Sequence, residues 1–149
     1  MFLSSNLKWQ SVMAFALMVG GLLWMFQRHE LFARTLPVQI VQGCAIGLMV
    51  AARITFGKRS FHAAANPTAG GLVTTGPYRW LRHPIYAAIL YFIWSTALDY
   101  RSYQAIAAAG LVTVGAVVRM YAEETLLIGK YAEYATYRAR TARVIPFVL

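Results

Sequence analysis

Long apolar runs separated by short polar segments restrict the fold of this chain more than any other feature. The runs cover residues 9–26, 37–56, 84–98 and 103–121. About 20 helical residues cross the hydrocarbon layer of a bilayer, and most of these runs approach or reach that length. Hydrophobic residues make up 59% of the chain and charged residues 13%, which exceeds what a soluble core of this size needs. The sequence therefore predicts an all-α membrane protein with about four transmembrane helices in a single domain, 1–149.

The third run is short, with 15 residues or roughly 22 Å of helix. One of its ends is therefore expected to lie below the lipid headgroups. A tight polar turn, 99–102, joins it to the fourth run, so the two runs form a helical hairpin. The hairpin brings the start of one helix and the end of the other to the same side of the membrane, together with Arg82, His83, Arg119, Glu123 and Glu124.

Beyond the fourth run, residues 123–142 alternate charged and apolar side chains, which predicts a C-terminal amphipathic helix on the membrane surface. Its tyrosines are expected to be interfacial anchors, and the alternative is a lid over a bound cofactor. The tail 144–149 is expected to pack against the bundle. Within the second run, Gly43 and Gly47 have the spacing of small residues that let membrane helices pack closely.

Lysine and arginine are distributed unevenly along the chain. Lys8, the stretch 53–82 and the chain from Arg119 onward hold eleven of them, whereas the turns after the first and third runs hold three. The positive-inside rule then predicts that both termini are cytoplasmic. Because the basic residues lie between apolar runs and form no nucleic-acid motif, a nucleic-acid partner is not expected. The single cysteine, Cys44, and the three separated histidines offer no metal-ligand spacing.

The stretch 75–86 is the strongest candidate for a functional site. Pro84 suits the first turn of a helix, with His83 as its cap, and a helix start offers free N–H groups to an anion. Tyr78 and Tyr86 add flat aromatic surfaces that suit an adenine ring or a cation. An interfacial belt of aromatic and basic residues at a helix end would have the same composition, so this alternative stays open.

A second candidate is the charged group at the end of the fourth run. Arg119 and Glu123 are four residues apart and share a helix face, with Glu124 beside them. A local salt bridge is one interpretation. Adjacent carboxylates below the headgroups are costly without a cation, however, and ionisable residues in a membrane usually serve a function.

Together these residues carry a family resemblance. The motifs are Gly76-Pro-Tyr-Arg-x-x-Arg82-His83-Pro84-x-Tyr86, Arg119-x-x-x-Glu123-Glu124, Tyr134-x-x-Tyr137 and Ile145-Pro146. Their combination resembles the isoprenylcysteine carboxyl methyltransferase and phospholipid methyltransferase superfamily of integral membrane enzymes. The resemblance covers 70–146.

The resemblance implies a cofactor, S-adenosylmethionine, bound at the cytosolic membrane face by residues 70–86 and 119–146. By position, the cofactor-binding residues would be Leu72, Val73, Tyr78, His83 and Tyr86, with Glu123 or Glu124. Arg119 matches the arginine that carboxyl methyltransferases place next to the substrate. The chain departs from the family pattern at Ala88 and Ala132, where the family usually has glycine.

The expected reaction is methyl transfer to a lipophilic acceptor that enters from the bilayer. Arg119 could orient an acceptor carboxylate, and Glu123 or Glu124 could accept the proton of an acceptor amine. These two acceptor classes stay open. The alternatives are a non-catalytic membrane scaffold or lipid-binding bundle, and a transporter, which is disfavoured because no charge lies near the middle of a run.

Overall fold

The computed structural model describes residues 2–57 and 71–146, and within these ranges it is helical. The elements are α1 (Phe2–Gln27), α2 (Leu36–Phe56), the short 3-10 helix η2 (Gly76–Arg79), α3 (Pro84–Tyr100), α4 (Tyr103–Lys130) and α5 (Tyr134–Arg140). The predicted all-α class is confirmed. The parts of the predicted connection before α3 and of the predicted tail that fall in 58–70 and 147–149 lie outside the described residues.

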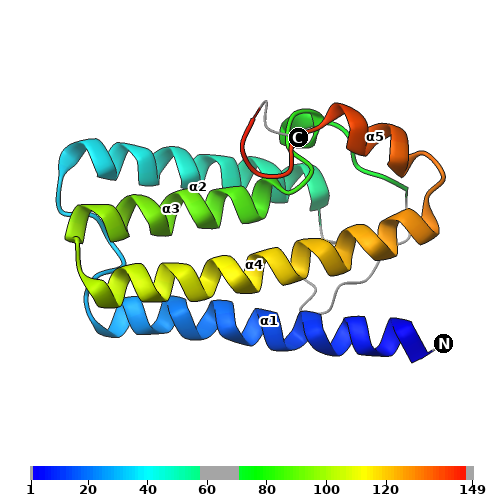
Figure 1. Ribbon diagram of the computed structural model, residues 1–149. Helices are drawn as coiled ribbons and strands as arrows, with labels where there is room; N and C mark the ends of the chain where they lie inside the picture. Colours follow the sequence, from blue (N-terminus) through cyan, green and yellow to red (C-terminus); the bar gives the residue numbers. More distant parts are fainter. Residues whose placement is uncertain (1, 58–70, 147–149) are drawn as a thin grey trace.

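The four long helices lie side by side in the order α1, α4, α3, α2, as Figure 1 shows. The main core is formed by α1, α3 and α4, where Met18, Ile93 and Val112 are buried together. The start of α1, the end of α4 and α5 lie at one end of the bundle, and the last described residues lie beside the start of α3 (Figure 1).

Three helices are long and apolar enough to cross a membrane among the described residues: α1, α2 and α4. Helix α3 has 17 residues and is about 26 Å long, below the length of a typical span. Its residues are nevertheless well buried between α2 and α4, including Ala87, Ile93 and Ala97. A fourth span formed by α3 stays a prediction.

Small residues bring α1 and α4 close together. A Cβ atom added at Gly21 would lie 2.6 Å from Val112 Cγ2, and one added at Gly115 would lie 2.6 Å from the Ala14 carbonyl oxygen. The sequence predicts close packing at Gly43 and Gly47 as well, and this prediction is wrong for contacts within the described chain. Both glycines are exposed on α2, and a Cβ atom added at either would have no described atom within 4 Å.

Helix α3 ends at Tyr100, two residues beyond the predicted end at Leu98. These two additional residues are held by contacts with the connection between α1 and α2. Asp99 Oδ2 accepts hydrogen bonds from the backbone N–H of Arg34 at 2.7 Å and of Thr35 at 3.1 Å. Asp99 therefore fixes the connection between α1 and α2 to the last turn of α3.

The predicted amphipathic helix 123–142 is wrong in its boundaries. Helix α4 continues to Lys130, a turn follows at 131–133, and α5 has only seven residues. The predicted boundary rests on the change from apolar to charged residues after Tyr121. That change does not end a helix, because the charged residues have partners on neighbouring segments and the backbone continues its hydrogen bonds.

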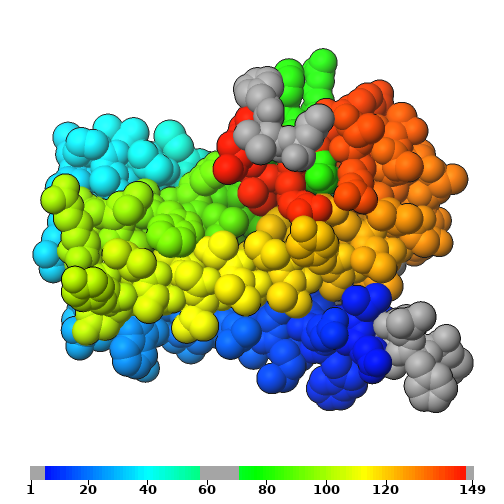
Figure 2. Space-filling model, in the orientation of Figure 1, coloured from blue at the N-terminus to red at the C-terminus, as the bar shows by residue number. Residues whose placement is uncertain are grey.

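The last described segment pairs with the entry to α3. Leu81 and Ala142 form an isolated parallel bridge, in which Arg82 N–H donates to the Ala142 carbonyl at 2.8 Å. His83 N–H donates to the Arg143 carbonyl at 3.1 Å. The Tyr91 hydroxyl donates to the carbonyl of Val144, so this part of the tail packs on the bundle as expected. Figure 2 shows this segment, in red, beside the green of α3 and above the gold part of α4.

Candidate active site

Glu124 is the centre of a buried ionic cluster that joins three segments. Its Oε1 atom lies 3.0 Å from Arg82 Nε and 3.0 Å from His83 Nε2, and its Oε2 atom lies 2.9 Å from Arg143 Nη2. The Glu124 side chain is 4% exposed. A carboxylate this well surrounded by donors has little capacity left for a ligand, so its main role is to hold the start of α3 and the tail against α4.

Glu123 has different surroundings although it is the adjacent residue. Its Oε1 atom accepts from the Tyr86 hydroxyl at 2.5 Å and lies 3.3 Å from Arg119 Nη2. Its Oε2 atom lies 3.7 Å from His83 Nδ1, and its side chain is 26% exposed. Of the two candidate glutamates, Glu123 is therefore the one that a ligand can reach.

Arg119 is buried where α1, α3 and α4 meet. Its Nε donates to the Tyr86 hydroxyl at 2.7 Å, and its Nη1 donates to the Ser11 carbonyl at 3.2 Å. The guanidinium carbon lies 5.2 Å from the centre of the Phe15 ring, within the range of a cation–π contact. The prediction that Arg119 and Glu123 share a helix face is confirmed. The structure adds the contacts of Arg119 with α1.

His83 occupies the predicted N-cap position of α3 but does not cap the helix with its side chain. Its ring lies between Glu123 and Glu124, as described above. The backbone N–H groups of Arg82 and His83 are also taken, by the tail carbonyls. The helix start therefore offers fewer free N–H groups to an anion than predicted.

The C-terminal tyrosines are buried, so the prediction that they are interfacial anchors is wrong for Tyr134 and Tyr137. The Tyr137 hydroxyl donates to the Tyr78 carbonyl at 2.7 Å, which fixes α5 to η2. Burial raises the pKa of Tyr134 to about 12 and also raises the pKa values of Tyr78 and Tyr137. All three phenols remain protonated near neutral pH.

The cofactor residues implied by the resemblance are not all brought together. Tyr86, His83 and both glutamates form one cluster. Tyr78 lies next to it, with its ring 5.4 Å from that of Phe56. Leu72 and Val73 lie in the irregular segment before η2, half-buried, and no hydrogen bond among the described residues joins them to the cluster.

Two buried hydroxyls at the cluster have no hydrogen-bond partner among the described residues: Ser11 Oγ and Tyr134 Oη. Ser11 is bound to Arg119 through its carbonyl oxygen. The charges of Glu124 and Arg82 are among those that act on the Tyr134 phenol. A buried hydroxyl without a partner is unfavourable, so these two atoms are candidate contacts for a bound molecule.

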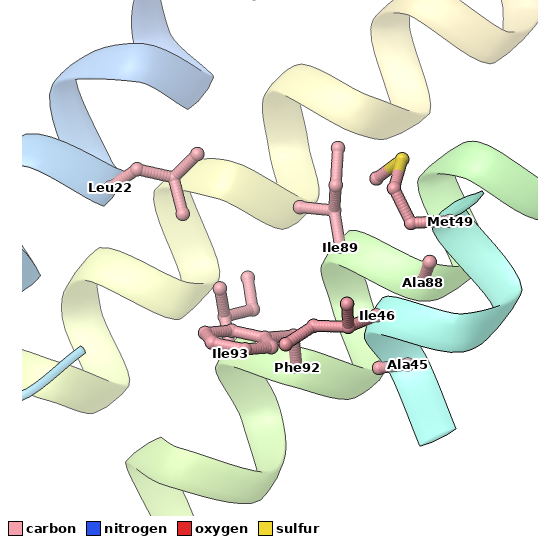
Figure 3. Close-up of a pocket in the computed structure, with 8 residues that line it drawn as sticks. All are labelled: Leu22, Ala45, Ile46, Met49, Ala88, Ile89, Phe92 and Ile93. Carbon is pink, nitrogen blue, oxygen red and sulfur yellow. The ribbon is translucent and has the colours of Figure 1, made fainter. Parts of the chain in front are cut away.

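An apolar cavity of about 140 Å³ lies between α1, α2 and α3 (Figure 3). Residues from all three helices line it: Leu22, Ala45, Ile46, Met49, Ala88, Ile89, Phe92 and Ile93. In Figure 3 the side chains of Leu22, Ile89 and Phe92 project toward a common space. A site lined only by hydrocarbon suits an acyl or prenyl chain.

Sequence reasoning misses several residues of the cluster. The motif places Arg82 near the site but assigns it no role, although Arg82 pairs with Glu124. Arg143 lies between the motif positions Tyr137 and Ile145 and carries no signal, since an arginine near other basic residues is normally solvated. Ser11 cannot be found from sequence, because the apolar run around it has no polar face.

Among residues 2–57 and 71–146, no group of three or more His, Cys, Asp or Glu side chains is arranged to hold a metal ion. Comparison of the chain with curated proteins and with solved structures gave no match. A family model described as phospholipid methyltransferase matches residues 39–134, which is more than half of the chain. With its long apolar helices, the chain is an integral membrane protein and belongs to the phospholipid methyltransferase family.

Proposed function

We propose that the protein transfers a methyl group from S-adenosylmethionine to a lipophilic acceptor at the cytosolic face of the membrane. The observation that carries this proposal is the position of Glu123, a partly exposed carboxylate held by Tyr86 and Arg119 beside a closed ionic cluster. Membership of a methyltransferase family supports the same reaction class.

The residues present fit the proposed cofactor. S-Adenosylmethionine carries an ammonium, a carboxylate and a sulfonium, so it needs both anionic and polar partners. Glu123 suits one of the positive groups, and the unpaired hydroxyl of Tyr134 suits a polar atom. The buried aromatic rings of Tyr78 and Tyr86 suit the adenine or the sulfonium.

When bound, S-adenosylmethionine supplies a methyl group whose bond to sulfur breaks as the acceptor's lone pair forms the new bond, leaving the electron pair on sulfur. The protein's task is then to position both reactants and to exclude water. Glu124, bound by Arg82 and Arg143, fixes the start of α3 and therefore the positions of His83 and Tyr86.

The role of the remaining groups depends on the acceptor. For an amine, the carboxylate of Glu123 accepts the proton that the nitrogen loses. For a carboxylate, Arg119 orients the acceptor oxygens, and no proton has to be removed. The name of the matching family favours an acceptor of the phospholipid class.

The same proposal includes four membrane-spanning helices, with α5 at the interface and both termini in the cytoplasm. It is supported by the uneven distribution of Lys and Arg and by the position of the start of α1 and of α5 at one end of the bundle. A reporter fused after Leu149 is expected to give a cytoplasmic signal, and a signal from the opposite side would contradict the orientation.

The central experiment is calorimetry of the detergent-purified protein with S-adenosylmethionine and with its demethylated product. Saturable binding of both ligands is expected. Radiolabelled methyl transfer to a membrane lipid extract then tests turnover. Glu133→Gln is a matched control, because Glu133 is an exposed glutamate outside the cluster. If the wild type binds neither ligand, the enzyme proposal fails and a non-catalytic lipid-binding bundle replaces it.

A further inference from the structure

Helix α1 lies outside the family match at 39–134, yet it contributes directly to the candidate site. The Ser11 carbonyl accepts from Arg119 Nη1, so the Ser11 hydroxyl, on the same residue, lies close to the guanidinium. Serine hydroxyls within helices usually donate to a carbonyl three or four residues earlier. That of Ser11 is fully buried and makes no hydrogen bond with any described residue. It is therefore available to a bound molecule.

The same face of α1 leads from this hydroxyl to the apolar cavity. Ser11, Phe15, Met18 and Leu22 are spaced by four, three and four residues, so they form one stripe along the helix. Leu22 lines the cavity. The stripe is about 16 Å long, which is close to half of the roughly 30 Å thickness of the hydrocarbon layer. It therefore has the length of a lipid chain in one leaflet.

Helix α3 provides a parallel stripe on the other side. Tyr86, Ile89 and Ile93 are spaced by three and four residues, and the last two line the cavity. Tyr86 belongs to the polar cluster through its bond to Arg119. In both helices the residue at the polar cluster comes first along the helix, and the residues that line the cavity follow it.

We propose that α1 forms the wall of the site on the acceptor side, and that the Ser11 hydroxyl is a specificity-determining contact for the polar end of an amphiphilic acceptor. The hydrocarbon chain of that acceptor lies in the cavity beside Leu22. This inference rests on the proposed methyl transfer and adds to it a residue from outside the family match.

Access to this site from the bilayer is available beside Phe15. Its side chain contacts the Arg119 guanidinium and is 41% exposed, so it lies between the buried guanidinium and the surface of the bundle.

The test compares Ser11→Ala with wild type and with Ser95→Ala, whose hydroxyl already donates to the Phe92 carbonyl at 2.9 Å. Without ligands, Ser11→Ala is expected to melt about 2 to 6 °C higher, because an unpaired buried hydroxyl is removed. With dioleoyl phosphatidylethanolamine in detergent micelles as the probe, its KM is expected to rise about 3- to 10-fold. The kcat and the affinity for S-adenosylmethionine are expected to stay unchanged.

A lower melting temperature for Ser11→Ala, or an unchanged KM, would overturn the role of Ser11. A dihexanoyl probe tests the hydrocarbon end, and a KM equal to that of the dioleoyl probe would overturn the assignment of the cavity. If the wild type binds S-adenosylmethionine but methylates neither probe, the acceptor assignment is overturned while cofactor binding stands. If it does not bind S-adenosylmethionine, the proposed function fails, and the melting comparison still decides whether Ser11 is a structural residue.

Discussion

Arg82 and Glu124, which are 42 residues apart, form a buried ion pair in which Nε lies 3.0 Å from Oε1. The Arg82 Nη1 atom also donates to the carbonyl oxygens of Arg138 and Thr141. One side chain therefore connects the start of α3 with α4, α5 and the tail. Since both charges are buried, removal of Glu124 leaves Arg82 without a carboxylate, whereas removal of Arg82 leaves Glu124 with Arg143 and His83.

Glu124→Gln is expected to destabilise the protein by about 3 to 5 kcal/mol, because Arg82 and Arg143 lose the carboxylate that compensates their charges. Thermal unfolding in detergent measures this change. The matched Glu133→Gln variant is expected to unfold like wild type, because Glu133 is exposed. Equal stability of all three proteins would mean that the cluster is solvated and not a structural centre.

Glu123→Gln is expected to have the opposite pattern, with a small effect on unfolding and a large one on cofactor affinity. The amide keeps the shape of the side chain but loses the charge that faces Tyr86 and Arg119. A lost hydrogen bond to a charged group lowers affinity about 10- to 100-fold. Calorimetry with S-adenosylmethionine measures it, and unchanged affinity would remove Glu123 from the cofactor site.

Arg119→Ala separates the two roles that Arg119 can have. If the guanidinium orients an acceptor carboxylate, turnover is expected to fall by about two orders of magnitude with little change in cofactor affinity. Arg119→Lys is expected to restore only part of the turnover, since an ammonium lacks the planar fork that bonds Tyr86 and Ser11. Joint loss of turnover, cofactor affinity and thermal stability would leave Arg119 as a structural ion-pair residue.

Gln42→Leu is expected to destabilise the bundle by about 1 to 3 kcal/mol without changing cofactor affinity. The Gln42 amide accepts from Ala33 N–H at 3.1 Å and donates to the Leu31 carbonyl at 3.0 Å and to the Thr96 hydroxyl. Leucine would leave the Ala33 N–H without this partner and remove the bonds to Leu31 and Thr96, at the end of the bundle opposite the candidate site. If Gln42→Leu lowered the cofactor affinity as much as Glu123→Gln does, the measured affinity would reflect only the stability of the fold.

The protein is expected to lose stability between pH about 10 and about 12. An unfolded tyrosine has a pKa near 10, whereas burial raises that of Tyr134 to about 12. Between these values the unfolded state has released the proton and the folded state has kept it, so rising pH favours unfolding. Tyr134→Phe is expected to flatten the dependence of melting temperature on pH in this window. If wild type and Tyr134→Phe had the same dependence of melting temperature on pH, other groups would cause the loss of stability at alkaline pH.

The sequence is sufficient to predict the helical class and the meeting of distant charges. Apolar runs of membrane length leave few alternatives to helices, and a short turn at 99–102 requires that α3 and α4 be antiparallel. From that constraint alone, Arg82 and Glu124 have to lie on the same side. Their ion pair is the confirmation.

The sequence does not show which face of a helix packs against which neighbouring helix. In α1 apolar residues surround the whole helix, so periodicity does not identify the face with Ser11 and Gly21. For the same reason the sequence does not distinguish Gly43 and Gly47, which are exposed, from Gly115, which packs against α1. The different surroundings of Glu123 and Glu124 depend on Arg143, which binds Glu124. Arg143 lies in a tail whose position no periodic pattern predicts.

The bridge between Leu81 and Ala142 also has a consequence for how the chain is made. Arg82 and Thr141, which it brings together, are 59 residues apart, so at 5 to 20 residues per second roughly 3 to 12 s separate their synthesis. During that interval α3 can enter the bilayer while its first turn still lacks the carbonyl partners of the tail. The polar end of the hairpin therefore lacks these partners until residues 141–143 have been made.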